Sequence, residues 1–253
     1  MKIVIITQND PFYLSSNLKF LLDNLPNKHK VVGVIVASAS PFGKKETFFQ
    51  KALKTKKIFG INFFIHYTFK FVYSKLFKPS LRNILNNFNI PEINIKGSIN
   101  SKKNLTIIDS YKPDLMVSIL GNQIFKKPLL ELAPKGCINL HTALLPKYRG
   151  LMPTFWVMKN NEKFTGVSVF FVDEGIDSGP IIVQEKIEIG NSTQQSLIIK
   201  TKRIGMQLIL KSIDLIANNK VTLIPNEATK KTYYSFPTRK DVLEFRKNGK
   251  KFF

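Results

Sequence analysis

The sequence predicts an α/β protein built on a mostly parallel, doubly wound sheet flanked by helices. Continuous apolar runs, typical of strands covered on both faces, occur at Lys2–Thr7, Val31–Ala37 and Leu115–Leu120. Segments with the spacing of amphipathic helices alternate with them, at Phe12–Asn24 and Lys102–Tyr111. This alternation favours parallel strands joined by helical crossovers, and it sets the fold class.

Two further strands are predicted in the second half of the chain. Val167–Val172 and Ile181–Ile189 flank a loop at Asp173–Pro180. The second of these runs ends by alternating apolar with polar residues, as a half-exposed antiparallel strand does. The pattern therefore predicts an antiparallel addition to the parallel sheet.

The chain is predicted to end in a helix-containing extension. Ser192 and Gln195 have the spacing of a capping box, and apolar spacing from Leu197 to Ile216 predicts a long helix after them. Val221–Ile224 is a short strand candidate, and Thr238 with Asp241 can cap a last short helix. We therefore divide the chain into a domain at 1–190 and a C-terminal helix and tail at 191–253, packed on it.

Composition is that of a globular protein in a reducing compartment. The chain has 253 residues, of which 43% are hydrophobic, and it has one cysteine, Cys137, predicted to be a small buried hydrophobe. The opening run is too short for a signal peptide, and no stretch of about 20 uncharged apolar residues appears. The expected location is the cytoplasm.

The formal net charge is +22, mostly from lysines spread along the whole chain. Arginine, whose planar fork suits specific phosphate and base recognition, is scarce. The charge is therefore interpreted as a solvated surface reflecting compositional bias, and nucleic acid is an unfavoured partner. Attraction to an anionic substrate, RNA or a membrane stays open.

The segment Asn62–Phe77 is apolar and aromatic on nearly every side. Such a helix is either a buried insertion or an element on a membrane surface. We expect it to be covered by the protein's own core or by a second copy in a homodimer, with Lys70 and Lys75 extending to solvent. Peripheral membrane contact is the alternative. His66, alone among aromatic residues, is interpreted as structural.

Residues 136–184 carry the polar groups best suited to chemistry. Asn139 and His141 lie two residues apart on an extended segment, so their side chains project to the same face. Asp177 follows 38 residues after Asn139, in a loop with Gly175 and Gly179. An amide can donate to an oxyanion, an imidazole can move a proton, and a carboxylate can orient the imidazole. Structural roles as turn and cap residues are the alternative.

This segment resembles the folate-dependent formyltransferase family, in which Asn-x-His, a Ser-Leu-Leu-Pro turn and a later Asp make up the active site. The resemblance covers about residues 1–190 and is most specific over 136–184. It implies a Rossmann-like domain, catalytic places for Asn139, His141 and Asp177, and N10-formyltetrahydrofolate as the donor. In the implied reaction an amine attacks the formyl carbon, Asn139 and His141 stabilise the oxyanion, and Asp177 positions a water that relays the amine proton.

The resemblance also implies where the donor binds. The residues that match the family's folate site are Leu120, Gly121, Leu144, Pro146, Val172, Asp173, Gly175 and Ile176. One departure is visible, because Ala143 stands where the family usually has serine before Leu-Leu-Pro. We therefore expect a side-chain hydrogen bond to be missing or displaced at this turn. No metal is expected, because the three histidines lie far apart and have no ligand spacing.

The family suggests three acceptors: a nucleotide-linked amino sugar for surface-polysaccharide synthesis, the aminoacyl end of initiator tRNA, and glycinamide ribonucleotide. Enzymes acting on tRNA carry a further C-terminal domain of about 100 residues, whereas about 60 residues follow Ser192 here. Thr7–Leu14 lacks the Gly-rich turn of the purine enzyme. The sugar is therefore the preferred acceptor, and Tyr233, Tyr234 and Phe236 are candidates to stack on its base. A non-catalytic, membrane-associated relative is the remaining hypothesis.

Overall fold

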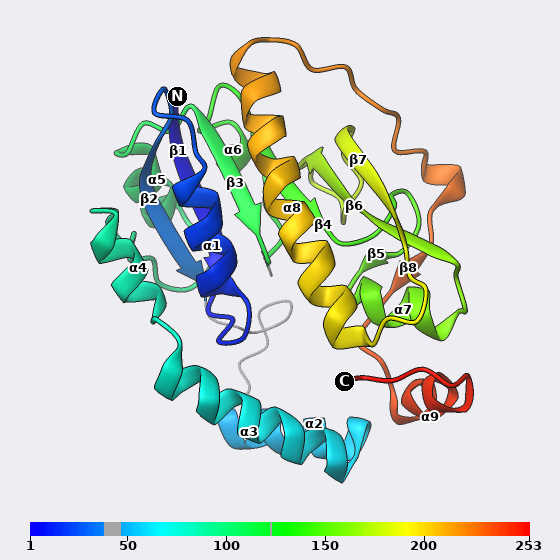
Figure 1. Cartoon of the computed structure of the whole chain (residues 1–253). Helices are drawn as coiled ribbons and strands as arrows, with labels where there is room; N and C mark the ends of the chain where they lie inside the picture. Colours follow the sequence, from blue (N-terminus) through cyan, green and yellow to red (C-terminus); the bar gives the residue numbers. More distant parts are fainter. Residues whose placement is uncertain (38–46, 122) are drawn as a thin grey trace.

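The computed structural model describes residues 1–37, 47–121 and 123–253. Its main sheet has six strands in the order β2-β1-β3-β4-β6-β7 (Figure 1). The strands are β1 (Lys2–Gln8), β2 (Lys30–Ala37), β3 (Leu115–Ile119), β4 (Cys137–His141), β6 (Phe164–Phe171) and β7 (Ile181–Glu188). The first four in this order run parallel, whereas β6 and β7 are antiparallel to their neighbours. The predicted mostly parallel sheet with an antiparallel addition is confirmed.

The helices are distributed over both faces of this sheet and one end of the molecule. They are α1 (Leu14–Asp23), α2 (Phe48–Phe59), α3 (Ile61–Phe77), α4 (Leu81–Asn87), α5 (Lys102–Asp109), α6 (Lys127–Leu130), α7 (Pro153–Lys159), α8 (Gln194–Ala217) and α9 (Arg239–Lys247). A short 3-10 turn spans Ala228–Lys230, and a small second sheet pairs β5 (Arg149–Gly150) with β8 (Tyr233–Tyr234).

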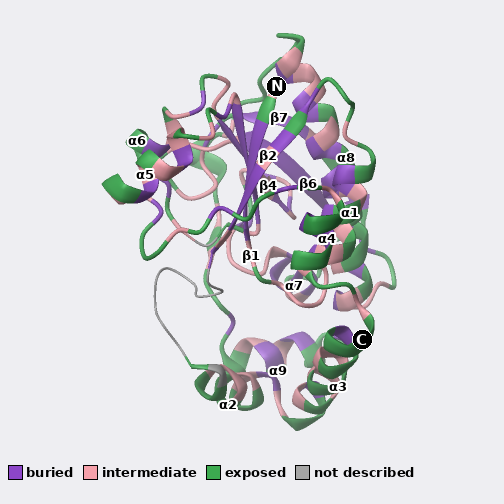
Figure 2. Ribbon diagram, turned by 90° about the vertical axis from the view of Figure 1, so that its left-hand side faces the viewer, coloured by how far each residue is buried: buried purple, intermediate pink, exposed green. Residues whose placement is uncertain are grey.

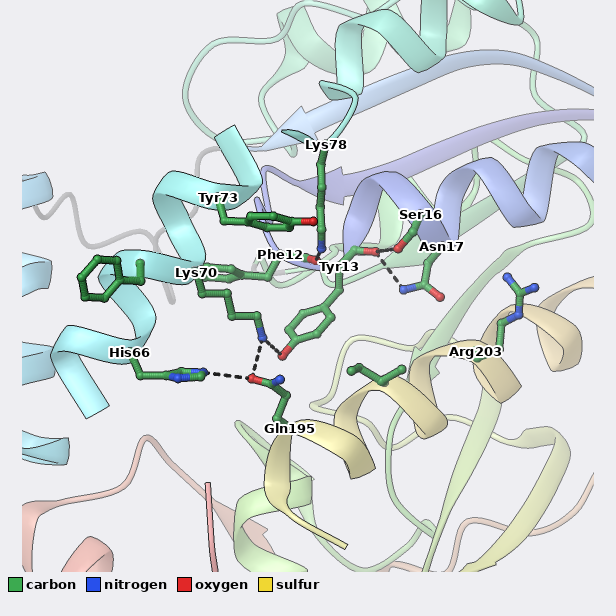
Figure 3. A pocket seen from close by; sticks show the side chains of 12 residues that line it. Phe12, Tyr13, Ser16, Asn17, His66, Lys70, Tyr73, Lys78, Gln195 and Arg203 are labelled. Atoms are coloured by element: carbon green, nitrogen blue, oxygen red, sulfur yellow. Dashed lines mark hydrogen bonds between the residues drawn. The ribbon is translucent and has the colours of Figure 1, made fainter. Parts of the chain in front are cut away.

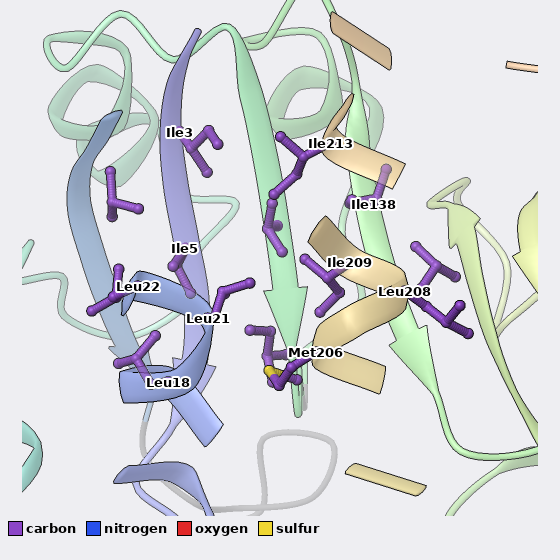
Figure 4. Close-up of a cluster of buried hydrophobic side chains, with 14 of the residues drawn as sticks. Ile3, Ile5, Leu18, Leu21, Leu22, Ile138, Met206, Leu208, Ile209 and Ile213 are labelled. Atoms are coloured by element: carbon purple, nitrogen blue, oxygen red, sulfur yellow. The ribbon is translucent and has the colours of Figure 1, made fainter. Parts of the chain in front are cut away.

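The core is formed where helices cover the two faces of the sheet. Alternate residues of each strand point to opposite faces, so Ile5 of β1 packs towards α1 and α8, while its neighbour Val4 packs towards α5 and α6. Figure 4 shows the first of these layers, in which Leu18 of α1 and Met206 and Ile209 of α8 meet the strands. The carboxyl ends of the parallel strands are thereby left as a rigid edge.

A separate aromatic cluster joins α2, α3, α7 and α9 beyond one end of the sheet. Phe59 of α2 stacks on Phe63 of α3 at 4.5 Å, and Phe63 meets Phe252 of the C-terminal tail at 4.9 Å. Between α2 and α3 the chain turns at Gly60, whose φ of +88° disfavours any residue with a Cβ. The two helices, here called the α2–α3 hairpin, are thus held to the body of the protein by their inner faces.

The tail differs from expectation in two details. Thr193, not Ser192, caps α8, since its side chain accepts a hydrogen bond from Ser196 N. Ile224 forms only an isolated bridge with Ile181 instead of a strand. The capping box of Thr238 and Asp241 is confirmed at the start of α9.

The expected burial of Asn62–Phe77 is wrong for the single chain. The segment is helical, but within it only Phe63 and Ser74 are buried, and Figure 2 shows the hairpin exposed over much of its outer side. Lys75 is exposed as expected, whereas Lys70 points inward. Among helices in the described parts of the chain, none is both long and apolar enough to cross a bilayer.

Candidate active site

A cavity of about 420 Å³ lies at the carboxyl ends of β1, β3 and β4, where open α/β sheets commonly bind ligands. Of the predicted residues, seven line it: Leu120, Gly121, Asn139, Val172, Gly175, Ile176 and Asp177. These positions come from three separate segments of the chain. The fold therefore brings most of the sequence-predicted site together.

Asn139 lies in β4, between Ser118 of β3 and Phe170 of β6. Its side chain borders the cavity, and within the described residues its buried Oδ1 has no hydrogen-bond partner. An unpaired buried polar atom is costly, so a ligand that donates a hydrogen bond here would be favoured. The site thus has an open polar position directly beside the cavity.

His141 and Asp177 form the ionisable pair of the site. The imidazole Nδ1 lies 3.5 Å from Asp177 Oδ2, while Nε2–H donates to the carbonyl oxygen of Tyr148 at 2.7 Å. A carbonyl can only accept, so the second bond fixes Nε2 as protonated and orients the ring. His141 is buried and does not line the cavity, whereas Asp177 borders both the cavity and the ring.

The loop that carries Asp177 is held in place from two sides. Asp177 Oδ2 accepts a hydrogen bond from Gly150 N at 2.8 Å. Asn226 Nδ2 donates to the carbonyl oxygens of Asp177 and Gly179, at 2.9 and 2.8 Å. Asp177 has a φ of +49°, a conformation that non-glycine residues seldom adopt. The surrounding bonds therefore determine its position.

The turn after β4 is fixed by neighbouring strands, which accounts for the alanine at its start. Ser168 Oγ of β6 donates to the Ala143 carbonyl at 2.6 Å and accepts from Leu145 N at 3.1 Å. Gln184 Nε2 of β7 donates to Ser168 Oγ and to the Leu145 carbonyl. Side chains of the sheet thus bind the backbone of this turn. A hydroxyl at Ala143 is not required for that.

Three predicted donor-binding residues lie outside the cavity lining. The side chain of Leu144 packs against Gly166 of β6, where a Cβ would clash with it. Pro146 follows Leu145 through a cis peptide bond in the turn. Asp173 Oδ1 accepts from Gly175 N and from Ser178 Oγ, at 3.1 and 2.6 Å, and so shapes the loop.

Several polar residues of the cavity carry no recognisable sequence signal. Gln194 and Lys202 of α8 line it, although helical periodicity alone marks neither residue. Lys202 Nζ lies 3.5 Å from Asp10 Oδ2, and burial lowers the pKa of the lysine while Asp10 opposes that shift. Asp10 also accepts from the backbone N–H groups of Phe12 and Tyr13 ahead of α1.

A second, larger cavity of about 710 Å³ lies between α1, α3 and α8 (Figure 3). Lys70 Nζ donates to Tyr13 Oη at 2.6 Å and to Gln195 Oε1 at 3.0 Å. Burial, reinforced by the nearby charge of Lys78, lowers the pKa of Lys70 to about 8. Lys78 and Arg203 add to this cationic lining.

The two cavities have a common neighbour. A small cavity of about 80 Å³ shares Tyr13 and Asn17 with the cationic cavity. It shares Thr142 and Lys202 with the cavity beside Asn139. The cationic cavity and the cavity that Asp177 borders are therefore neighbours.

The remaining predicted groups lie as follows. His66 stacks on Phe253 at 3.8 Å, in keeping with a structural role. Tyr234 stacks on Tyr148 and Trp156, whereas Phe236 lines the cavity beside Asn139 and Tyr233 is largely exposed. Cys137 is buried, and burial raises the pKa of its thiol. Within the described ranges no three His, Cys, Asp or Glu residues gather as metal ligands.

Solved structures with this fold include several formyltransferases. An N-formyltransferase from Helicobacter canadensis, in complex with folinic acid and dTDP-3-aminofucose, matches 93% of this chain and 71% of its own, at 22% identity and a TM-score of 0.57. Phosphoribosylglycinamide formyltransferase from Anaplasma phagocytophilum matches 92% of this chain and 98% of its own, at 18% identity and a TM-score of 0.63. At these identities the likeness establishes the fold.

Sequence comparison gives the family. A methionyl-tRNA formyltransferase from Kosmotoga olearia is 34% identical over 182 residues, which is 71% of this chain and 58% of that protein. The chain spans about half the length of the curated relatives it matches. The model of the formyl transferase family matches residues 1–213, and these include β4, the Asp177 loop and most of α8. The chain therefore belongs to the formyl transferase family.

Proposed function

We propose that this chain transfers a formyl group from N10-formyltetrahydrofolate to the primary amine of a nucleotide-linked amino sugar. The observation that carries the proposal is that the cationic cavity neighbours the cavity lined by Asn139 and Asp177, with His141 behind Asp177. Family membership supports the reaction class, and the positive charge that lines the cationic cavity supports the acceptor.

The cavity beside Asn139 suits the donor. Its volume lies in the usual range for small-molecule sites, roughly 300–1,000 Å³. Leu120, Val172 and Ile176 supply apolar walls for a planar ring system, and the unpaired Oδ1 of Asn139 can accept a hydrogen bond. The Asn139 amide would donate to the formyl oxygen as it gains negative charge.

We assign to Asp177 the role of receiving the proton that the acceptor amine loses. It borders the cavity, and His141 lies behind it at 3.5 Å. The amine nitrogen bonds to the formyl carbon, the bond from that carbon to the folate nitrogen breaks, and the proton moves from amine to folate nitrogen. Asp177 would hold that proton between the two nitrogens, and His141 would orient and stabilise the carboxylate.

The cationic cavity suits the nucleoside diphosphate of the acceptor. Lys70, Lys78 and Arg203 can pair with phosphate oxygens, and the rings of Phe12 and Tyr13 offer faces for a base. With the diphosphate there, the amine on the sugar would extend towards the neighbouring cavity and Asp177. An uncharged acceptor would make no use of these cations.

The test is a formylation screen read by mass spectrometry. Purified protein with N10-formyltetrahydrofolate is offered a panel of nucleotide-linked amino sugars, charged initiator tRNA and glycinamide ribonucleotide. We expect a mass gain of one formyl group on a nucleotide-linked amino sugar. Efficient formylation of tRNA or glycinamide ribonucleotide instead would overturn the proposed acceptor but keep the reaction class.

Charged initiator tRNA is the second candidate acceptor. Curated relatives that the chain matches are named methionyl-tRNA formyltransferases, and the chain carries a net charge of +22. Those relatives are about twice as long as the part that this chain matches. The comparison therefore concerns only the matched part of each relative.

A further inference from the structure

The outer side of α3 carries a continuous row of exposed apolar side chains. Its members are spaced four, four, three and four residues apart, which places them on one face of a helix. They are Ile61, Ile65, Phe69, Val72 and Leu76, exposed by 51, 46, 73, 47 and 70%, and are called the apolar stripe below. Phe49 and Leu53 are exposed in the same way on α2.

The orientation of α3 is fixed by its opposite face, so the stripe cannot turn inward. Phe63 is buried in the aromatic cluster, Tyr67 meets the ring of Phe12 at 5.3 Å, and Ser74 Oγ donates to the carbonyl of Pro11. Lys78 Nζ donates to the carbonyl of Phe12 at 2.8 Å. The stripe therefore stays on the outside of the folded chain.

The charged residues of the hairpin itself have one sign. From residue 47 to residue 91 the sequence holds eight lysines and arginines and neither aspartate nor glutamate. Lys56, Lys57 and Lys75 are exposed on the hairpin itself. Any partner of this surface must accept apolar side chains and supply negative charge.

The apolar stripe and the lysines of the hairpin together favour one class of binding partner over the others. In a twofold dimer through the stripe the same patch faces itself, so lysines of the hairpin would oppose lysines, and residues 47–91 supply no carboxylate to offset them. RNA would pair with the lysines but leave the stripe in water. An anionic bilayer satisfies both, because its acyl boundary takes apolar side chains and its headgroups attract lysine. We propose that the α2–α3 hairpin docks on the surface of an anionic lipid bilayer.

The docked orientation brings one cavity close to the headgroups. The hairpin forms one end of the molecule, away from the sheet, in both views (Figures 1 and 2). Phe69 belongs to the stripe and, with Tyr73, also lines the cationic cavity. The helix of 17 residues, about 25 Å long, would lie in the membrane plane.

The experiment measures co-sedimentation with vesicles of phosphatidylcholine, with and without about a quarter phosphatidylglycerol. We expect binding to the anionic vesicles to be at least about tenfold tighter than to the neutral ones, and to weaken at high salt. Val72→Asp with Leu76→Asp should lower it by about tenfold or more, since two charges would enter the acyl boundary. The matched control, Leu223→Asp with Leu243→Asp, changes two side chains that are each 50% exposed elsewhere and should bind as the wild type does.

The contribution of the hairpin lysines to binding is tested by the same vesicle assay, again with a matched control. Lys56→Glu with Lys57→Glu should weaken binding more than Lys102→Glu with Lys103→Glu, an adjacent exposed pair on α5. Formyl transfer to a soluble acceptor without vesicles should be unchanged in all four variants, so docking and catalysis are tested separately. Absence of wild-type binding, or equal loss in the Leu223/Leu243 control, overturns the proposal. So does a dimer in sedimentation velocity that Val72→Asp with Leu76→Asp dissociates.

Discussion

At the scale of single residues, Asp177 links the cavity to the buried imidazole, because its Oδ2 lies 3.5 Å from His141 and 2.8 Å from Gly150 N. We expect Asp177→Asn to lower kcat by about a hundredfold or more, since an amide can neither take the proton nor stabilise a charged imidazole. His141→Asn should cost as much, and the double variant far less than the product of the two losses. Steady-state kinetics measures this.

The control for these variants is Glu174→Gln, which removes an exposed carboxylate from the same loop. Its kcat should stay at the wild-type level. Near-wild-type turnover of Asp177→Asn would show that the carboxylate has no part in proton transfer.

Lys70 gives the site a pH dependence. Its pKa is lowered to about 8 by burial and by Lys78, while Asp10 opposes the shift. Below that pH the free lysine is charged and binds a diphosphate fully; above it the charge is lost, and the Michaelis constant for the nucleotide-linked acceptor should rise. We expect this Michaelis constant to rise by up to roughly tenfold between about pH 7.5 and 9. A change of that size corresponds to the loss of one charged hydrogen bond.

The matched variant is Lys70→Arg, which keeps its charge at every working pH and should flatten the profile without weakening binding at neutral pH. Lys70→Met should bind the acceptor weakly throughout. An unchanged Michaelis constant for the wild type from neutral to alkaline pH would exclude Lys70 from the acceptor site.

At the scale of secondary-structure elements, the turn after β4 depends on β6. The buried hydroxyl of Ser168 bonds the Ala143 carbonyl, Leu145 N and Gln184 Nε2. Ser168→Ala would leave these groups unpaired and should lower the free energy of unfolding by about 1–3 kcal/mol. Ser212→Ala is the control, since that equally buried hydroxyl bonds only the Leu208 carbonyl within α8. Chemical denaturation measures both, and equal losses would contradict this role for Ser168.

At the scale of the whole molecule, the net charge of +22 separates the candidate acceptors. Binding of tRNA through many phosphates would lose about 10³-fold or more in affinity between 50 and 200 mM salt. A nucleotide-linked sugar contacts two phosphates, so its Michaelis constant should change by less than about tenfold over that range. Measuring the Michaelis constant for the nucleotide-linked sugar at these two salt concentrations tests the prediction. A steep rise of this constant with salt would argue for a polyanionic acceptor.

The sequence by itself determined the elements and the central motif. Apolar periodicity predicted the strands and helices, because side chains that face a core recur at the period of their own element. The sequence also placed Asn139 and His141 on an extended segment and Asp177 in a loop, and the fold brings all three together. The division at residue 190 and the catalytic roles of these residues stay predictions.

Only the tertiary structure decided which groups meet across long stretches of sequence. Ser168 and Gln184 bind the backbone of the turn that begins with Ala143. Lys202 of α8 forms an ion pair with Asp10, which lies near the N-terminus. Lys70 turns inward and the apolar stripe outward. The physical reason is that α3 is apolar and aromatic on nearly every side. Its sequence therefore lacks the alternation of polar and apolar residues that would indicate which face is buried. The packing of Phe63 with residues of α2, α7 and α9 determines which face of α3 points inward.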